Sequence, residues 1–262
     1  MILLDPTAHP VIGHRGASAE APENTMPSFL RAIEQGVDAI ELDVHVTADD
    51  VPVVMHDPTV TRTTSGDGAI AAMSWRQLRE LDAGARFTPD GGATFPFREQ
   101  GIRVPTVEEV LTAIPSDLLM LIEVKALHAQ WPLRRVLERF EAAPRCIVAA
   151  FEAGSLNAFL DPPFACGASR RDVMMLMART AVGLGPGRVP YRAICPPNEY
   201  YGAPVPIGLI VRGAKRLGAP VHVWTVDEPR EARRLWARGV NGIISNAPRK
   251  ILEERKRMRT ED

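Results

Sequence analysis

Several short polar strings in this sequence stand directly after apolar runs that are typical of buried strands. Their side chains include three carboxylates, two histidines and two cations: Glu41, Asp43, Glu123, His14, His56, Arg15 and Lys125. Carboxylates can hold a hard divalent cation, a pair of imidazoles can exchange protons, and Arg or Lys can bind an anion. This combination favours the chemistry of phosphate esters.

The carboxylates are the first group to examine. Glu41 and Asp43 stand two residues apart in one apolar run, so on a strand their side chains point to the same side. Glu123 ends another such run. Arg or Lys usually neutralises a lone pair of carboxylates, but three that converge carry more charge than one ion pair can neutralise. We therefore predict that Glu41, Asp43 and Glu123 bind one divalent cation, Mg²⁺ or Ca²⁺.

Two histidines end strand-like runs near these carboxylates. They are His14 and His56, and Asp57 follows His56, where its carboxylate could orient the ring. Imidazoles on opposite sides of a phosphorus atom can serve as general base and general acid. We predict that both histidines are catalytic, with either one as the base.

His45 is a rival for the metal. It has the same strand parity as Asp43, and its participation would indicate a zinc hydrolase with nitrogen-rich ligation. It lies further along the chain, toward a predicted turn. We expect its side chain to be exposed to solvent instead.

Five further residues are candidates for binding a substrate. Arg15 and Lys125 can bind phosphate oxygens and stabilise charge that builds on them. Asn24 can either donate a hydrogen bond to a phosphate oxygen or cap the helix that follows it. Trp224 and Phe151 follow later strands and can wall a pocket for an alcohol.

The elements that must position these residues alternate between strand and helix along the chain. Strand patterns occur at 11–14, 39–44, 119–124, 146–151, 164–167, 193–195, 222–226 and 242–245. Helical patterns occur at 25–36, 107–114, 133–142, 207–217 and 230–238. Eight β/α repeats in 262 residues predict a TIM (β/α)8 barrel, one catalytic domain over 1–262, with its active site at the carboxyl ends of the strands.

One piece does not fit the repeat. Residues 52–56 follow the second strand after a turn that is too short for a parallel crossover, which predicts a β-hairpin that brings His56 back beside Glu41. Residues 57–105, with a short helix at 74–81, then form an insertion that we expect to cap the active-site face. A stretch rich in glycine and proline, 178–192, predicts a variable loop near the pocket.

Composition excludes several classes of protein. A net charge of −1 argues against bulk nucleic-acid binding, and no apolar stretch is long enough for a transmembrane segment. The three cysteines lack metal-site spacing and favour buried reduced thiols. Little chain precedes His14, so we expect no cleaved signal peptide and a cytoplasmic protein. The basic tail 249–259 predicts a solvated helix end rather than a membrane patch, and no oligomeric state is predicted.

Taken in order from about residue 11 to residue 248, the strings resemble the glycerophosphodiester phosphodiesterases. The strings that carry the resemblance are Val11-Ile12-Gly13-His14-Arg15-Gly16, Pro22-Glu23-Asn24-Thr25, Glu41-Leu42-Asp43-Val44, Val53-Val54-Met55-His56-Asp57-Pro58, Val104-Pro105-Thr106-Val107-Glu108-Glu109-Val110-Leu111, Glu123-Val124-Lys125 and Val221-His222-Val223-Trp224-Thr225-Val226.

The resemblance has implications for fold, site and activity. It implies a TIM barrel with a small insertion after the His-Asp motif. It also implies that the three carboxylates bind metal, that the two histidines are the acid and base, and that Arg15 and Lys125 contact phosphate. The implied reaction is hydrolysis of a small glycerophosphodiester to glycerol phosphate and an alcohol, as part of glycerol and lipid metabolism.

The chain departs from the family pattern at two places. The family commonly reads Asp-Gly-Ile-Ile-Thr-Asp where this chain has Asn at positions 241 and 246, and it commonly has Ser at the position of Ala150. We expect both departures to lie away from the metal site and to affect substrate preference.

Two alternative functions stay open. One is a phosphodiesterase that acts on lysophospholipids or another lipid headgroup through an apolar entrance. The other is a barrel that binds phosphodiesters without turnover. The complete set of histidines and carboxylates favours catalysis, since a binding module has no use for an acid and a base.

Overall fold

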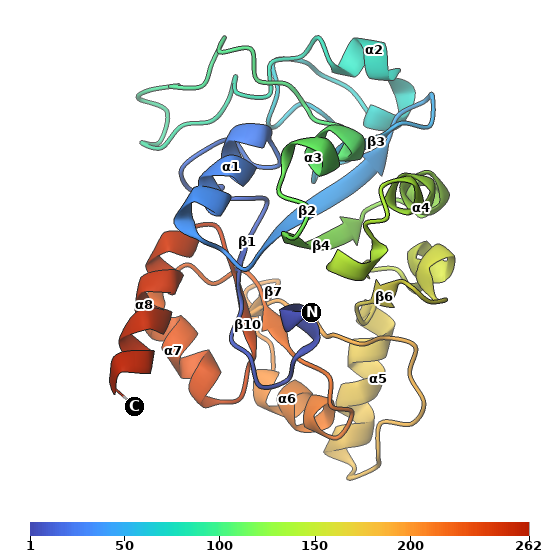
Figure 1. The fold of residues 1–262 in the computed structure, drawn as a ribbon, viewed down its shortest axis with the longest axis vertical. Helices are drawn as coiled ribbons and strands as arrows, with labels where there is room; N and C mark the ends of the chain where they lie inside the picture. Colours follow the sequence, from blue (N-terminus) through green and yellow to red (C-terminus); the bar gives the residue numbers. More distant parts are fainter. Residues whose placement is uncertain (262) are drawn as a thin grey trace.

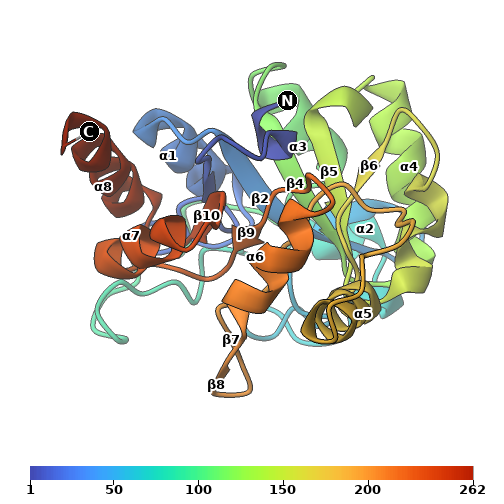
Figure 2. The same cartoon turned by 90° about the horizontal axis from the view of Figure 1, so that it is seen from below.

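The structure, a computed structural model, describes residues 1–261 and is built around one sheet of parallel strands. The parallel strands lie in the order β6, β5, β4, β2, β1, β10, β9 (Figures 1 and 2). Their bounds are β1 Val11–Gly13, β2 Ala39–Val46, β4 Leu119–Val124, β5 Cys146–Ala149, β6 Ala165–Cys166, β9 His222–Val223 and β10 Gly242–Ser245.

At the place of the sixth predicted strand, the barrel closes through isolated bridges and not through a full strand. We expected a strand at 193–195, but there the chain forms only isolated parallel bridges, from Ala193 to Gly167 and from Ile194 to Val221. Prolines flank this segment at 190, 196 and 197 and provide no N–H to extend a ladder. The predicted TIM barrel is confirmed, with its sixth strand reduced to these bridges.

Helices surround the strands (Figure 2). Their bounds are α1 Met26–Gln35, α2 Trp75–Leu78, α3 Val107–Ala113, α4 Gln130–Arg139, α5 Arg170–Ala181, α6 Ile207–Lys215, α7 Pro229–Ala237 and α8 Pro248–Glu261. Short 3-10 helices are η1 Ile2–Leu4, η2 Ile70–Ala72, η3 Leu127–Ala129, η4 Ala143–Arg145 and η5 Ala153–Phe159.

Local sequence explains where α1 begins and ends. Thr25 is its N-cap, Pro27 lies in the first turn and Gly36 ends it with a left-handed φ of 83°, all as predicted. One expectation about another helix was wrong, because the first residues of the predicted loop 178–192 belong to α5. The predicted helix end at 249–259 is part of α8, which packs through the fully buried Ile251 and leaves Lys250, Lys256 and Arg257 exposed.

The hairpin expected after β2 is present. Strand β3, Pro52–Val54, pairs antiparallel with β2, with Val54 opposite Val44 and Pro52 opposite Val46. Residues 57–105 follow at the upper end of the molecule in Figure 1 and pack around their own apolar side chains, including Ile70 and Leu78. A second hairpin, β7 Glu199–Tyr200 and β8 Ala203–Pro204, projects from the barrel (Figure 2).

Strand alternation separates the apolar core from the site. On β2, Leu42 and Val44 are fully buried in the layer between strands and helices, while Glu41 and Asp43 point the opposite way. All three cysteines are free, and Cys146 and Cys166 are buried in β5 and β6, as predicted.

None of the helices within residues 1–261 is both long enough and apolar enough to span a bilayer.

Two glycines with similar backbone angles test how tightly the loop after β1 packs. Gly16 has a φ of 88°, and a Cβ there would lie 2.5 Å from the backbone carbonyl carbon of Ser28 on α1. Gly36 has a φ of 83° and open space around it. We expect Gly36→Ala to lower the free energy of unfolding by about 1–2 kcal/mol through backbone strain. Gly16→Ala should lower the free energy of unfolding by about 1–3 kcal/mol more than Gly36→Ala does, because the loop must also move to make room for the Cβ. Urea unfolding of both variants measures the difference, and equal losses would contradict the close packing.

Candidate active site

A cavity of about 620 Å³ opens at the carboxyl ends of the strands. Its polar lining includes His14, Arg15, Glu41, His56, Glu123 and Lys125 at the inner end and Arg170 further out. Its apolar lining includes Phe151, Val173, Met174, Met177, Tyr200, Pro206 and Trp224. The site residues predicted from the sequence, apart from Asp43 and Asn24, therefore border one pocket.

The three predicted carboxylates lie together at the inner wall of this site. Glu41 and Asp43 come from β2, and Glu123 comes from β4, where it lies directly opposite Asp43 in the ladder. Each offers one oxygen, and these oxygens lie within 4.8 Å of one another. Strand register thus produces the convergence that the sequence suggested.

Two cations contact this cluster but do not neutralise it. Lys125 Nζ lies 3.3 Å from Asp43 Oδ1 and 3.0 Å from Glu123 Oε1, and Arg15 Nε lies 3.2 Å from Asp43 Oδ2. Among the described residues, no Lys or Arg forms an ion pair with Glu41, which accepts the backbone N–H of Arg15 at 3.0 Å. Two positive charges therefore face three carboxylates.

Burial gives these carboxylates different proton affinities. Burial, and then the neighbouring Asp43, raise the pKa of Glu41 well above its usual value. Burial also raises the pKa of Glu123, against the opposing charge of Lys125. Burial acts on Asp43 in the same direction, but Lys125 and Arg15 bring its pKa below the ordinary value. Buried oxygens with negative charge left over form a donor set that fits a hard divalent cation.

His14 is held in one tautomer by an amide. Its Nδ1 lies 2.6 Å from Asn246 Oδ1, and Asn246 Nδ2 donates to Asp227 Oδ2 at 2.9 Å. Because a carboxylate can only accept, the amide oxygen must face His14, so Nδ1 carries the proton and Nε2 has a free lone pair. Burial, and then the charge of Arg15, lower the pKa of His14 to about 4. The imidazole is neutral at neutral pH.

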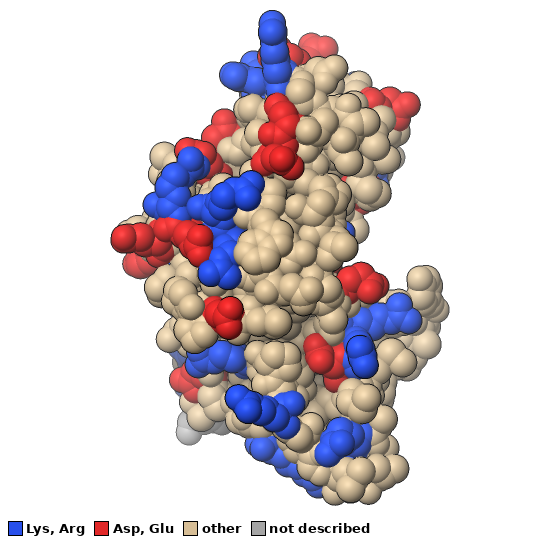
Figure 3. Space-filling model, turned by 90° about the vertical axis from the view of Figure 1, so that its right-hand side faces the viewer, with Lys and Arg blue, Asp and Glu red and all other residues tan. Residues whose placement is uncertain are grey.

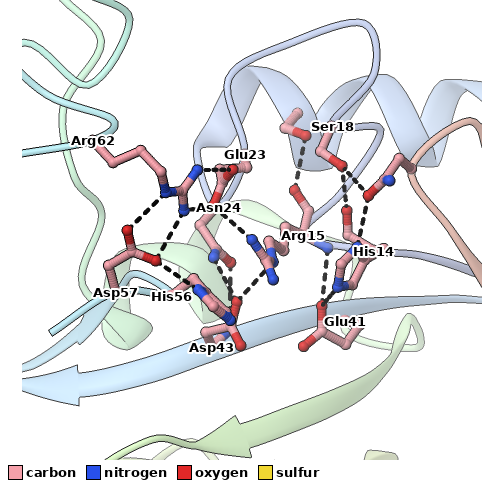
Figure 4. Close-up of polar contacts among 12 residues, drawn as sticks. His14, Arg15, Ser18, Glu23, Asn24, Glu41, Asp43, His56, Asp57 and Arg62 are labelled. Carbon is pink, nitrogen blue, oxygen red and sulfur yellow. Dashed lines mark hydrogen bonds and ion pairs between the residues drawn. The ribbon is translucent and has the colours of Figure 1, made fainter. Parts of the chain in front are cut away.

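His56 is held differently, by a charged network. Its Nδ1 donates to Asp57 Oδ1 at 2.7 Å, and Arg62 binds both Asp57 and Glu23. The Arg62 guanidinium holds the pKa of Asp57 well below its usual range. His45 Nε2 donates to the backbone carbonyl of His56 at 3.1 Å, which fixes the backbone. In Figure 4 His56 lies beside Asp43 and His14 beside Glu41, at opposite ends of the cluster.

Two sequence expectations are corrected by these contacts. We expected His45 to be exposed, but it is buried because its ring packs under the hairpin against the His56 carbonyl. We also expected the departure at position 246 to affect substrate preference, whereas Asn246 bonds directly to His14, one of the two predicted catalytic histidines.

Asn24 is turned toward a carboxylate. Its Nδ2 donates to Asp43 Oδ2 at 2.8 Å, and its Oδ1 accepts from the Asp43 backbone N–H at 3.3 Å. The N-cap of α1 is Thr25. The contacts of Asn24 therefore orient Asp43 and do not cap the helix.

Four residues of the site were not predicted as site residues: Glu23, Arg62, Asp227 and Asn246. The ion pair between Arg62 and Glu23 joins residues 39 positions apart, and the bond from Asn246 to His14 spans 232 positions. The available signals were the family string at 22–25, which contains Glu23, and the departure from the family pattern at position 246.

The aromatic walls lie where the sequence predicted. Trp224 stacks near His14 with 6.4 Å between ring centroids, and Phe151 meets Trp224 edge to face at 6.1 Å. Helix α5, which the sequence did not predict, adds Val173, Met174 and Met177 to the lining.

A parallel barrel with clustered carboxylates and paired histidines at the strand ends is typical of hydrolases that act on phosphate esters. The model of the glycerophosphoryl diester phosphodiesterase family matches residues 14–144 and 178–250. The chain belongs to this family of phosphodiester hydrolases.

Two relatives agree with this assignment, and a solved structure agrees with the fold. A glycerophosphodiester phosphodiesterase of Caldanaerobacter subterraneus is 34% identical over 92% of this chain and 96% of its own. A probable glycerophosphodiester phosphodiesterase of Mycobacterium tuberculosis is 32% identical over 90% of this chain and 86% of its own. The fold matches an Oleispira antarctica phosphodiesterase, solved in complex with the product sn-glycerol-3-phosphate, with a TM-score of 0.74, 24% identity and coverage of 95% and 97%.

The titration of His14 should respond to the charge at position 246. A carboxylate introduced there alone would face Asp227, so the informative variant exchanges both, Asp227→Asn/Asn246→Asp. This keeps the bond between the two side chains and puts a negative charge against Nδ1. We expect the pKa of His14 to rise from about 4 by about one pH unit or more, so the imidazolium persists to higher pH.

NMR titration of the labelled, metal-free protein measures this pKa directly. Asp227→Asn alone is the matched control, because it removes a charge without placing one against His14. An unchanged His14 pKa in the exchanged variant would contradict the assigned contact.

Proposed function

We propose that the protein catalyses metal-dependent hydrolysis of glycerophosphodiesters to glycerol phosphate and an alcohol, with His14 and His56 as base and acid. The observation that carries the proposal is the carboxylate cluster with one histidine at each end (Figure 4). The product in the Oleispira antarctica structure is the class of product that this reaction releases.

Each predicted site residue has a part in this proposal. Glu41, Asp43 and Glu123 hold one Mg²⁺ or Ca²⁺, which supplies positive charge at a phosphate oxygen when bound. Arg15 and Lys125 bind the non-bridging oxygens of the phosphate, and Asn24 assists by orienting Asp43. Trp224 and Phe151 pack against the alcohol portions of the substrate.

The environments of the two histidines support a division of roles. His14 offers an unprotonated Nε2 and stays neutral at neutral pH, as a general base requires. It takes the proton from the oxygen that attacks phosphorus. The Nδ1 of His56 bonds to the Asp57 carboxylate, which orients the ring, and His56 gives a proton to the leaving oxygen as the phosphorus–oxygen bond breaks.

Two broader expectations belong to the same proposal. Residues 1–262 act as one catalytic domain, and the insertion at 57–105 caps one side of the bound substrate, close to Arg62. Three free thiols support our proposal that the protein works in the cytoplasm.

Turnover of a small panel tests the function. Glycerophosphocholine, glycerophosphoethanolamine and glycerophosphoglycerol should each release glycerol phosphate when Mg²⁺ or Ca²⁺ is present, and a chelator should abolish the release. Restoring metal should restore the rate, because the cluster would otherwise keep excess negative charge beside an anionic substrate. Full activity in chelator would contradict metal dependence, and no turnover of any diester would contradict the function.

The apolar lining favours a second candidate, hydrolysis of lysophospholipids. Met174, Met177 and Tyr200 extend the pocket beyond the size that a glycerol phosphate group needs. Adding lysophosphatidylcholine to the panel separates the two substrate classes. A kcat/KM that exceeds the value for glycerophosphocholine would favour the lipid substrate.

Activated substrates distinguish the two histidines. We expect His14→Ala and His56→Ala each to lower the rate on natural diesters by about 10²–10⁴-fold. A nitrophenyl diester has a leaving group that needs no proton, so His56→Ala should retain most activity on it while His14→Ala stays impaired. Steady-state rates on both substrates test this. Equal losses on both would contradict the division of roles, and a fully active His14→Ala would contradict the mechanism.

A further inference from the structure

Helix α5 and the β7–β8 hairpin form an exposed surface beside the pocket mouth. We call it the rim face and define it by Arg170, Arg171, Met174, Met175, Val182, Leu184, Arg188, Tyr200 and Tyr201. We propose that the rim face docks on the surface of an anionic lipid bilayer and brings the pocket mouth to it.

Helix α5 turns apolar side chains toward solvent. Leu176 and Thr180 are its buried residues, and the opposite side carries Met174, Met175 and Val182, which are 56%, 53% and 70% exposed. A surface helix ordinarily places polar residues there. A group of exposed apolar side chains beside a pocket indicates a surface that binds something.

The hairpin adds aromatic side chains at its tip. Tyr201 and Gly202 form the turn with φ values of 50° and 77°, and Tyr201 is 93% exposed. Its ring lies 4.5 Å from that of Tyr200. Tyrosine is enriched at membrane interfaces, where its ring enters the apolar region and its hydroxyl stays in water.

The charge of this region is strongly positive. Residues 165–218 contain eight Arg and Lys against two Asp and Glu, although the whole chain has 31 and 32. Within residues 1–261, none of these eight cations takes part in an ion pair. The lowest part of the surface in Figure 3 shows blue atoms and no red ones, and red atoms begin higher up, at the level of the upper turns of α5.

The positive charge of the rim face indicates which kind of partner binds there. A second copy of the chain would bring two sets of unpaired cations together, which disfavours self-association through the rim face. The phosphates of anionic lipids attract the arginines, and the adjoining Met and Tyr side chains can enter the apolar boundary. Exposed cations next to apolar side chains therefore fit an anionic bilayer.

The rim face is continuous with the pocket. Met174 and Tyr200 line the cavity and are also exposed at its edge, and the Arg170 guanidinium lies 5.9 Å from the Tyr200 ring centroid. Docking would therefore turn the pocket mouth toward the lipid. Binding to a bilayer is measured without turnover, so the inference stands or falls independently of the proposed reaction.

Vesicle sedimentation tests the proposal. The wild-type protein should sediment with vesicles of equal parts phosphatidylglycerol and phosphatidylcholine at low ionic strength, and several-fold less with phosphatidylcholine alone. Arg171→Gln/Arg188→Gln should lower the partition coefficient at least about fivefold, since each cation near an anionic surface contributes on the order of 1 kcal/mol. Met175→Ser/Tyr201→Ser should also lower it several-fold through lost apolar insertion. None of these four residues lines the pocket.

Matched controls remove the same kinds of side chain elsewhere. Arg76→Gln/Arg79→Gln and Leu30→Ser/Leu160→Ser change exposed residues outside the rim face and should bind vesicles like wild type. All variants should keep the far-UV circular dichroism spectrum and the cooperative thermal unfolding of the wild type, which shows that they are folded.

Three outcomes would overturn the proposal. One is no sedimentation of the wild-type protein with anionic vesicles. Another is an equal loss of binding in rim and control variants. The last is a wild-type dimer in sedimentation velocity that Met175→Ser/Tyr201→Ser abolishes, because a second copy would then occupy the rim face.

Discussion

The burial of Glu41 and Asp43 beside the half-buried Glu123, at the ends of β2 and β4, is the constraint on which the site depends. Asp43 is 1% exposed and Glu41 is 5% exposed, so solvent cannot screen their repulsion. Strand pairing in register sets Asp43 directly opposite Glu123, and relaxing this contact would require a slip of the whole ladder. The apolar residues that alternate with them hold the register, because a slip would turn Leu42 and Val44 toward the site.

The conformation of the loop after β1 places hydrogen-bond donors against these carboxylate oxygens. Arg15, Gly16 and Asn24 all adopt left-handed backbone angles within ten residues. In this conformation the Arg15 N–H reaches Glu41, and the Asn24 amide reaches Asp43 on both sides. Non-glycine residues adopt such angles at a cost of about 1 kcal/mol or more. Hydrogen bonds to buried carboxylates are strong enough to offset that cost.

Part of this structure was predictable from the sequence, through the spacing of apolar residues and the alternation of side chains on a strand. Alternation on a strand put Glu41 and Asp43 on one side, and a turn too short for a crossover identified the hairpin that carries His56. Thr25, Pro27 and Gly36 marked the ends of α1 by local chemistry alone. These features depend on neighbouring residues, so a single sequence contains the information for them.

Other features depended on contacts that local sequence does not contain. Helix α5 shows no clear apolar stripe because Met174 and Met175 face solvent, so periodicity gave no signal for it. His45 appeared to lie beyond the barrel, and only the packing of the hairpin buries it. The bond from Asn246 to His14 joins the last strand to the first, and closure of the barrel alone brings these residues together.

The cavity combines two physical environments that a phosphodiester requires together. Three carboxylates meet only two cations in the cluster at its inner wall, so in the proposed function Arg15, Lys125 and the divalent cation together would offset the charge that repels a phosphate. Its apolar wall, which includes Phe151 and Met177, is suited to the uncharged part of such a substrate. Arg170 stands at the rim between this wall and solvent, where an unpaired cation attracts an anionic substrate before the carboxylates repel it. Cations at the rim and beside the cluster would therefore attract an anion to a site whose carboxylates alone would repel it.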